Sequence, residues 1–269
     1  MNIIHSKTAN TVWQSVRFDI VDSGWARLDS RWNQSHISPP YSRLYYILSG
    51  EGSARNAFQE MPLRPGHVYL LPMGISLEHS CPREMTQLYF HISARAADGY
   101  DLFSRCSRFM ELPMEGTMEK LAEAFLSENY LSLALLKTQA ERDLYRFIGA
   151  ASLDEWLLRP HSVFLEKVFS IVQKELCSCL TIRQVAQQMA ISESTLSKRF
   201  RQEYGLPLGR YVNGILMQEI CRLLASTDLP IGQIAEQLGF CDQFYLARFF
   251  SQHQGLSPRK YREEIRRQF

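Results

Sequence analysis

Two short segments carry side chains that could bind duplex DNA. In residues 184–200 (QVAQQMAISESTLSKRF) and 233–250 (QIAEQLGFCDQFYLARFF), Lys198 and Arg248 each stand between a leucine and a phenylalanine at the same spacing. Arginine can bond guanine, glutamine can bond adenine, an aromatic edge can contact a thymine methyl, and basic groups bind phosphates. The residues that we expect to face DNA are Ser194, Ser197, Lys198, Arg201, Gln243, Phe244, Arg248 and Ser251.

The first half of each segment, together with the two residues before it, has the apolar spacing of a helix. Apolar residues at i, i+3, i+4 and i+7 form one helical face, and they are Ile182, Val185, Ala186 and Met189 in one copy and Ile231, Ile234, Ala235 and Leu238 in the other, 49 positions later. A turn follows each run. Ser192 and Asp242 are natural N-caps there, and Gly239 can adopt a positive φ.

The second halves of the two segments correspond to each other at an offset of 50 positions. Leu196 with Phe200, and Leu246 with Phe250, form the inward pairs of a second helix, and the same offset relates Tyr211 to Tyr261. Two offsets that differ by one residue indicate a duplication with one residue added in the second turn. We therefore predict two helix-turn-helix units.

The outward faces of the two second helices carry the expected DNA contacts. If Leu196 and Phe200 point inward, a rotation of about 100° per residue turns the eight residues named above outward. Ordinary solvated helix faces are the alternative interpretation. Duplication and charge favour DNA, because residues 161–269 hold fourteen Lys and Arg against ten Asp and Glu, whereas residues 1–160 hold sixteen against eighteen.

A single helix is expected between the two units. Residues 208–226 (LGRYVNGILMQEICRLLAS) are apolar along one helical face. At about 1.5 Å per residue this helix spans roughly 28 Å, comparable to the roughly 34 Å between successive major-groove faces of B-DNA. One chain could therefore read two adjacent major-groove segments.

Residues 165–264 resemble the DNA-binding domain of the AraC/XylS family, which has two helix-turn-helix units joined by a long helix. The resemblance rests on Ile231, Ile234, Ala235, Gly239, Phe240, Leu246, Arg248, Phe250, Gly255, Ser257, Pro258, Tyr261 and Arg262. It implies a sequence-specific transcription regulator that binds promoter DNA and works with RNA polymerase. Phe244 and Leu246 stand where the family usually has a small polar residue and Phe, and this exchange concerns the operator sequence rather than the fold. Leu216 stands in the connecting helix where a basic residue is common.

The first half of the chain has the texture of strands and turns. From about residue 16 to 95, apolar runs alternate with Gly and Pro signals, which indicates a β-sandwich or barrel. We expect an α+β chain of two domains, an N-terminal cupin-like β-barrel with helices over residues 1–155 and an all-α domain over residues 160–269. The linker is expected near Pro160.

A helical stripe is expected between residues 118 and 150, with no Gly or Pro before Gly149. Its apolar residues recur every three or four positions, namely Leu133, Leu136, Ala140, Leu144 and Phe147. The stripe could pack on its own barrel or on a twin helix in a homodimer. We use the second alternative to predict a dimer.

The stretch RPGHVYLLPMG resembles the second cupin motif through Gly66, Pro72 and Gly74. The resemblance implies that the barrel senses a small molecule. The histidine of metal-binding cupins is replaced by Leu77, and the upstream histidine pair and glutamate are missing. We therefore expect no metal, no other cofactor and no catalytic residue; the alternative is a cupin-type metal-dependent enzyme fused to a helical domain.

Polar and aromatic residues near the expected strands are candidates for holding an effector, because stacking and hydrogen bonding suit a sugar-like ligand. They are Trp25, Arg31, Trp32, His36, Tyr45, His79, Tyr89 and His91, with Glu78 beside them. We therefore expect a ligand-responsive activator of carbohydrate or related metabolite genes.

Compartment and redox state follow from composition. The longest apolar runs are far shorter than the roughly twenty residues of a membrane helix, and the first residues lack a secretory pattern. We expect a cytoplasmic protein that contacts no membrane. In that compartment the six cysteines, Cys177 and Cys179 among them, are expected to be free thiols.

Overall fold

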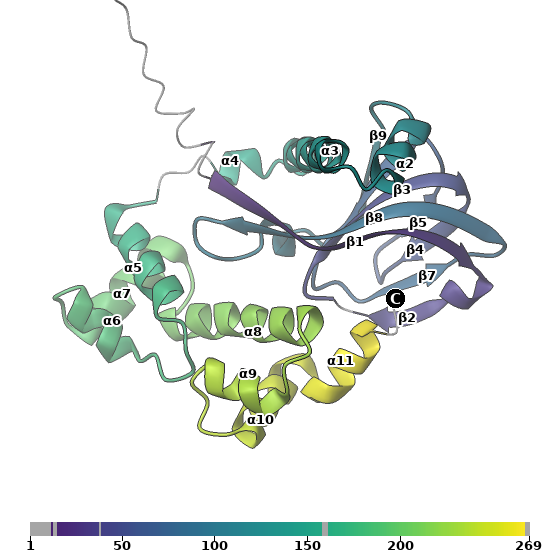
Figure 1. The fold of residues 1–269 in the computed structure, drawn as a ribbon. Coiled ribbons are helices and arrows are strands. Elements are labelled where there is room, and N and C mark those ends of the chain that lie inside the picture. The colour runs from purple at the N-terminus through teal and green to yellow at the C-terminus, as the bar shows by residue number, and fades with distance from the viewer. Residues whose placement is uncertain (1–11, 13–14, 38, 158–160, 267–269) are drawn as a thin grey trace, which may run out of the picture. The chain divides into compact units, whose positions relative to one another are not determined.

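The computed structural model describes residue 12 and residues 15–37, 39–157 and 161–266, without the side chains of residues 34–37 and 156. The chain divides into two compact units (Figure 1). The first runs to Arg95 and continues from Asp101 to Leu158; the second comprises Ala96–Tyr100 and Arg159–Arg267. The linker expected at Pro160 lies outside the described residues.

Two sheets build the first unit. The larger sheet has the order β1 (Val16–Asp29), β8 (Glu84–Ala96), β3 (Ser42–Gly50), β6 (His67–Leu71) and β9 (Met110–Pro113). The smaller sheet has the order β2 (Gln34–Ile37), β7 (Leu77–Ser80), β4 (Gly52–Arg55) and β5 (Glu60–Leu63). The neighbouring strands that are paired in register run antiparallel, as expected for short strands joined by turns.

Strand β3 separates two cores. Successive side chains of a strand point to opposite faces, so Tyr45 and Ile47 pack in the core shared by the two sheets, whereas Leu44 and Tyr46 pack in the core between the larger sheet and the helices. Both sides of this strand are buried. A single strand therefore supports both the sheet interior and the helical layer.

Two helices cover the larger sheet where the sequence suggested an uninterrupted run. Helix α2 (Met118–Leu126) ends at Ser127, and α3 (Tyr130–Ala150) begins after Asn129, whose side chain accepts hydrogen bonds from the backbone N–H groups of residues 131 and 132. An asparagine N-cap thus starts a new helix without any Gly or Pro. A short helix, α4 (Asp154–Leu157), follows.

The apolar stripe of α3 packs on its own unit. Leu136, Ala140, Leu144 and Phe147 belong to the core beneath the helix and are almost completely buried, whereas Leu133 is partly exposed. The prediction that this stripe mediates a dimer is therefore wrong. The helix is held further by the buried Asp143, which accepts hydrogen bonds from Tyr46, Gln139 and Arg146.

The second unit is helical apart from Ala96–Tyr100. Its helices are α5 (Val163–Lys174), α6 (Ile182–Gln188), α7 (Glu193–Tyr204), α8 (Leu208–Ser226), α9 (Ile231–Gln237), α10 (Gln243–Gln254) and α11 (Pro258–Arg266). Helix α8 has the bounds predicted for the connecting helix and contacts α7, α9, α10 and α11. It is the long green helix of Figure 1.

The five residues Ala96–Tyr100, from the last residue of β8 to two residues before the short 3-10 helix η2 (Leu102–Arg105), belong to the second unit. Asp98 is fully buried there. Its carboxylate accepts a hydrogen bond from the Tyr204 hydroxyl at 2.7 Å, and its carbonyl accepts one from the Tyr211 hydroxyl at 2.6 Å. The chain therefore enters the second unit twice, which the sequence did not indicate.

Within the described part of the chain, no helix combines the length and apolar character needed to cross a membrane.

The expectation of six free thiols is wrong, because the loop after α5 brings the Cα atoms of Cys177 and Cys179 to 5.2 Å and their sulfurs form a disulfide. Cys81, Cys106, Cys221 and Cys241 are free.

Candidate nucleic-acid interface and effector site

Helices α6 and α7 form one pair, and α9 and α10 form a second pair of the same dimensions. The first helix of each pair has 7 residues and the second has 12. Ser192 caps α7 by accepting a hydrogen bond from the backbone of Thr195, and Asp242 caps α10 through Tyr245. Gly205 and Gly255 end the two helices in the left-handed conformation.

Equivalent side chains anchor the second helix of each pair. Leu196 and Phe200 of α7 are completely buried, as are Leu246 and Phe250 of α10. Burying two large apolar side chains on one face fixes the rotation of each helix about its axis. The opposite faces of α7 and α10 must therefore be exposed.

The residues predicted for α7 lie together at the surface. Ser194, Lys198 and Arg201 are exposed and Ser197 is half-buried. They line a groove of about 680 Å³ together with Gln202 and the start of α8. Gln202, four residues after Lys198, was missed although the helical period places it on this face.

The exposed face of α10 is more aromatic. Gln243 and Arg248 are exposed, Ser251 is half-buried, and 66% of the Phe244 surface is accessible. The guanidinium of Arg248 lies 5.8 Å from the ring centre of Tyr245, an exposed residue that the sequence argument missed. An arginine that lies over an aromatic ring can still donate hydrogen bonds from its N–H groups.

Three cations on these faces are available to bind anions. Among the described residues, Lys198, Arg201 and Arg248 take part in no ion pair with an acidic side chain. Arg199 differs, since its guanidinium lies 4.2 Å from the Phe164 ring centre and pairs with Glu203. Arg199 therefore packs α7 against α5, whereas the other three can contact phosphates or bases.

Five of the predicted effector residues gather in the core between the two sheets or at its margin. His79 stacks on Trp32 with ring centres 4.2 Å apart and lies 6.0 Å from Tyr45, and Tyr89 lies 4.9 Å from His91. Tyr45 and Tyr89 face each other across β3 and β8. The Tyr89 pKa is raised to about 12 by burial and by Asp22, so its hydroxyl remains protonated.

Three further residues belong to this cluster and were missed. Tyr41 stacks on His91 at 4.3 Å, Arg43 is paired in register with His91, and Gln87 lies on the same strand. Arg43 and Gln87 are almost completely buried. The alternation of β3 and β8 could have identified them, because residues 41, 43 and 45, and residues 87, 89 and 91, share a face.

Both histidines of the cluster are neutral. Burial, reinforced by the positive charge of Arg43, holds the pKa of His79 and of His91 well below the usual range. A neutral imidazole offers one donor and one acceptor. The cluster therefore presents neutral polar groups and the buried, positively charged guanidinium of Arg43 beside aromatic rings.

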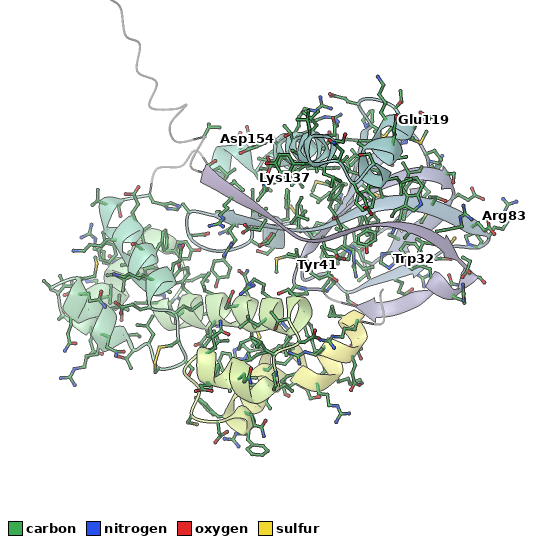
Figure 2. The ribbon with its side chains drawn as sticks, in the orientation of Figure 1. Trp32, Tyr41, Arg83, Glu119, Lys137 and Asp154 are labelled. Atoms are coloured by element: carbon green, nitrogen blue, oxygen red, sulfur yellow. A yellow bond between two sulfur atoms is a disulfide. The ribbon has the colours of Figure 1, made fainter. Side chains whose placement is uncertain are left out.

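Several of these buried polar atoms have no hydrogen-bond partner within the described residues. They are the Tyr41 hydroxyl, both ring nitrogens of His79 and Oε1 of Gln87. Leaving such a group unsatisfied costs about 1–3 kcal/mol. Trp32 and Tyr41, which are marked in Figure 2, belong to this buried cluster.

The remaining predicted effector residues lie elsewhere. Arg31 is exposed and paired with Asp29. Trp25 is half-buried in β1, and Glu78 pairs with Arg55. His36 lies in β2, but its side chain is outside the described part of the chain. Within that part there is no group of three side chains suited to a metal ion.

Comparison with known proteins identifies relatives of both halves. A family profile described as a helix-turn-helix domain matches residues 185–264. The multiple antibiotic resistance protein MarA of Escherichia coli (strain K12) is 30% identical over 101 residues, which are 38% of this chain and 80% of MarA. The arabinose operon regulatory protein of the same strain is 25% identical over 250 residues, 84% of this chain and 83% of that protein.

A solved structure extends the comparison to the whole fold. ToxT from Vibrio cholerae superimposes with a TM-score of 0.52 at 15% sequence identity, covering 93% of this chain and 98% of ToxT. At this identity the likeness concerns the fold. It supports the arrangement of a sheet-rich N-terminal part followed by a helical C-terminal part.

Proposed function

The chain belongs to the AraC/XylS family of transcription regulators, and from that premise we propose that its two helix pairs read two successive major-groove segments of one operator. Helices α7 and α10 are the proposed recognition helices, with the eight predicted residues, Gln202 and Tyr245 at the interface. The observation that carries the proposal is the equivalence of the two pairs. The same buried anchors leave Lys198 and Arg248 exposed at the same point of each recognition helix.

The sheet-rich unit is proposed to be a cupin-like effector-sensing domain. Its ligand is a small polar molecule of the sugar type, bound among Trp32, Tyr41, Tyr45, His79 and Gln87. Hydrogen bonds from the ligand would satisfy the buried oxygens and nitrogens, and the rings would pack on its apolar face. The likeness to the arabinose operon regulatory protein supports a sugar ligand.

A thermal-shift screen of sugars and related metabolites on the full chain tests the effector site. A ligand that binds only the folded protein raises the melting temperature. Tyr41→Phe keeps the ring and removes the unsatisfied oxygen, so the shift should shrink. Tyr46→Phe is the matched control, because Tyr46 lies in the core between the larger sheet and the helices, where its hydroxyl donates a hydrogen bond to Asp143. An unchanged shift in Tyr41→Phe would contradict this placement.

The remaining parts of the proposal concern partners. We propose a cytoplasmic activator that works with RNA polymerase, and a homodimer that forms through the exposed face of α3 instead of its buried stripe. That face carries Tyr130, Leu131 and Leu135, which are 87%, 64% and 62% exposed. The role requires no enzyme activity, metal or cofactor.

A further inference from the structure

The disulfide between Cys177 and Cys179 lies at the junction of the two helix pairs. The loop that carries it connects α5 to α6 of the first pair. Its middle residue, Ser178, donates a hydrogen bond from its backbone N–H to the Leu238 carbonyl at 2.8 Å, and its hydroxyl donates to the Gly239 carbonyl. Both acceptors belong to the turn between α9 and α10.

The bonded cysteines also pack directly against this turn. Gly239 adopts a φ of +68°, and a Cβ at this position would lie 3.0 Å from Cys177 Cβ and 3.3 Å from Cys179 Sγ. The turn leads within three residues to Asp242, the N-cap of α10. The loop therefore supports the point at which the second proposed recognition helix begins.

Accessibility makes this disulfide open to exchange. Cys179 is exposed and Cys177 is half-buried. Exposed disulfides are reduced more readily than structural disulfides that are shielded from thiols. The disulfide closes only a three-residue segment, so it constrains the local loop rather than the folding of the unit.

We propose that Cys177 and Cys179 form a reversible thiol-disulfide site that adjusts DNA affinity through the second helix pair. A glutathione thiolate attacks Cys179 Sγ, the S–S bond breaks, and Cys177 leaves as a thiolate that takes up a proton. A second glutathione thiolate attacks the mixed disulfide and releases Cys179. Two glutathione thiols become one glutathione disulfide, and their two protons and two electrons pass to the two cysteines.

The oxidised state is the one that binds DNA more tightly. With the S–S bond closed, the loop holds Ser178 in place for both of its hydrogen bonds to the turn. After reduction the loop gains conformational freedom. Binding to DNA then has to order the turn before α10, and the conformational entropy lost in this ordering lowers the DNA affinity. This inference rests on the proposed role of α10 in DNA recognition.

The test compares the full chain in oxidised and reduced glutathione. A duplex is first selected from a random pool by the full chain, and its affinity is then measured by fluorescence anisotropy in both buffers. Mass spectrometry after alkylation reports the state of the two thiols. Reduction should weaken binding about fivefold, the effect of losing about one net hydrogen bond.

Two variants separate this site from other thiols. Cys177→Ser/Cys179→Ser should bind with the weaker affinity in both buffers. Cys241→Ser is the matched control, because Cys241 is an exposed free thiol two residues after Gly239 in the same turn. It should retain the full response, since Cys241 is not part of the disulfide. The inference, but not the proposed function, would be overturned if the cysteines stay reduced across the glutathione range or if the wild-type affinities are equal in the two buffers. Failure to select any duplex in either buffer would overturn the proposed function as well.

Discussion

Phe200 and Phe250 occupy the same place in two helices fifty residues apart. Each is the eighth residue of a 12-residue helix and is completely buried. The ring centres of Phe200 and Tyr211 are 5.4 Å apart, and those of Phe250 and the equivalent Tyr261 are 5.2 Å apart. The two helix pairs therefore have equivalent buried residues as well as basic residues at equivalent exposed positions.

Loss of either basic residue at the proposed interface should weaken specific binding. Lys198→Ala and Arg248→Ala should each cost roughly 1–3 kcal/mol. Footprints should lose protection in different halves of the site, about one helical turn apart. Arg199→Ala is the control, because Arg199 packs on Phe164 and should affect stability more than DNA affinity. Loss of the same half-site in both variants would contradict the placement of α7 and α10.

The turn between α6 and α7 and the turn between α9 and α10 can be tested by exchanging alanine and glycine at equivalent positions. Ala190 has a φ of +53° where the second pair has Gly239, and the left-handed conformation costs alanine about 1 kcal/mol. Ala190→Gly should therefore raise the free energy of unfolding by about that amount in urea titrations. Gly239→Ala should lower it by more, since its Cβ would press on Cys177. A loss of stability in Ala190→Gly would contradict this account.

The exposed face of α3 gives a test of dimerisation. Leu131→Glu/Leu135→Glu should yield monomers by light scattering, with stability nearly unchanged because both side chains are exposed. Leu136→Glu, in the buried stripe, should instead unfold the sheet-rich unit. A double variant that remains dimeric would exclude this face.

Asp101 should make the stability of the chain depend on pH. Burial raises its pKa to about 6, despite backbone hydrogen bonds from Ala94 and Phe103. Between about pH 4 and 6 the folded state holds more protons than the unfolded state, so stability falls as pH rises through this range. The loss by pH 7 is on the order of 3 kcal/mol. Urea titrations should show a flatter pH profile for Asp101→Asn, and parallel profiles would contradict the assignment.

Features that depend on local periodicity could be predicted from the sequence. The bounds of α8 and the burial of Leu196, Phe200, Leu246 and Phe250 follow from helical spacing alone. Features set by contacts distant in sequence could not. Ser178 meets Leu238 only in the folded unit, and Arg43 joins the buried cluster only because β3 pairs with β8.

The interpretation of α3 failed for a similar reason. An apolar stripe shows that a helix has a partner, but its sequence does not distinguish its own sheet from a second molecule. The break before α3 was not predicted, because Asn129 marks it and no Gly or Pro does. An N-cap can separate two helices equally well.

Residues Ala96–Tyr100 limit how this regulator can be taken apart for engineering. A biosensor built by joining residues 160–269 to a foreign sensor would lack Asp98, and the buried Tyr211 hydroxyl would lose the carbonyl that accepts its hydrogen bond. A cut at one peptide bond therefore does not separate interchangeable modules. A working chimera has to carry this five-residue segment in its sensor, or replace Tyr204 and Tyr211 with side chains that do not require it.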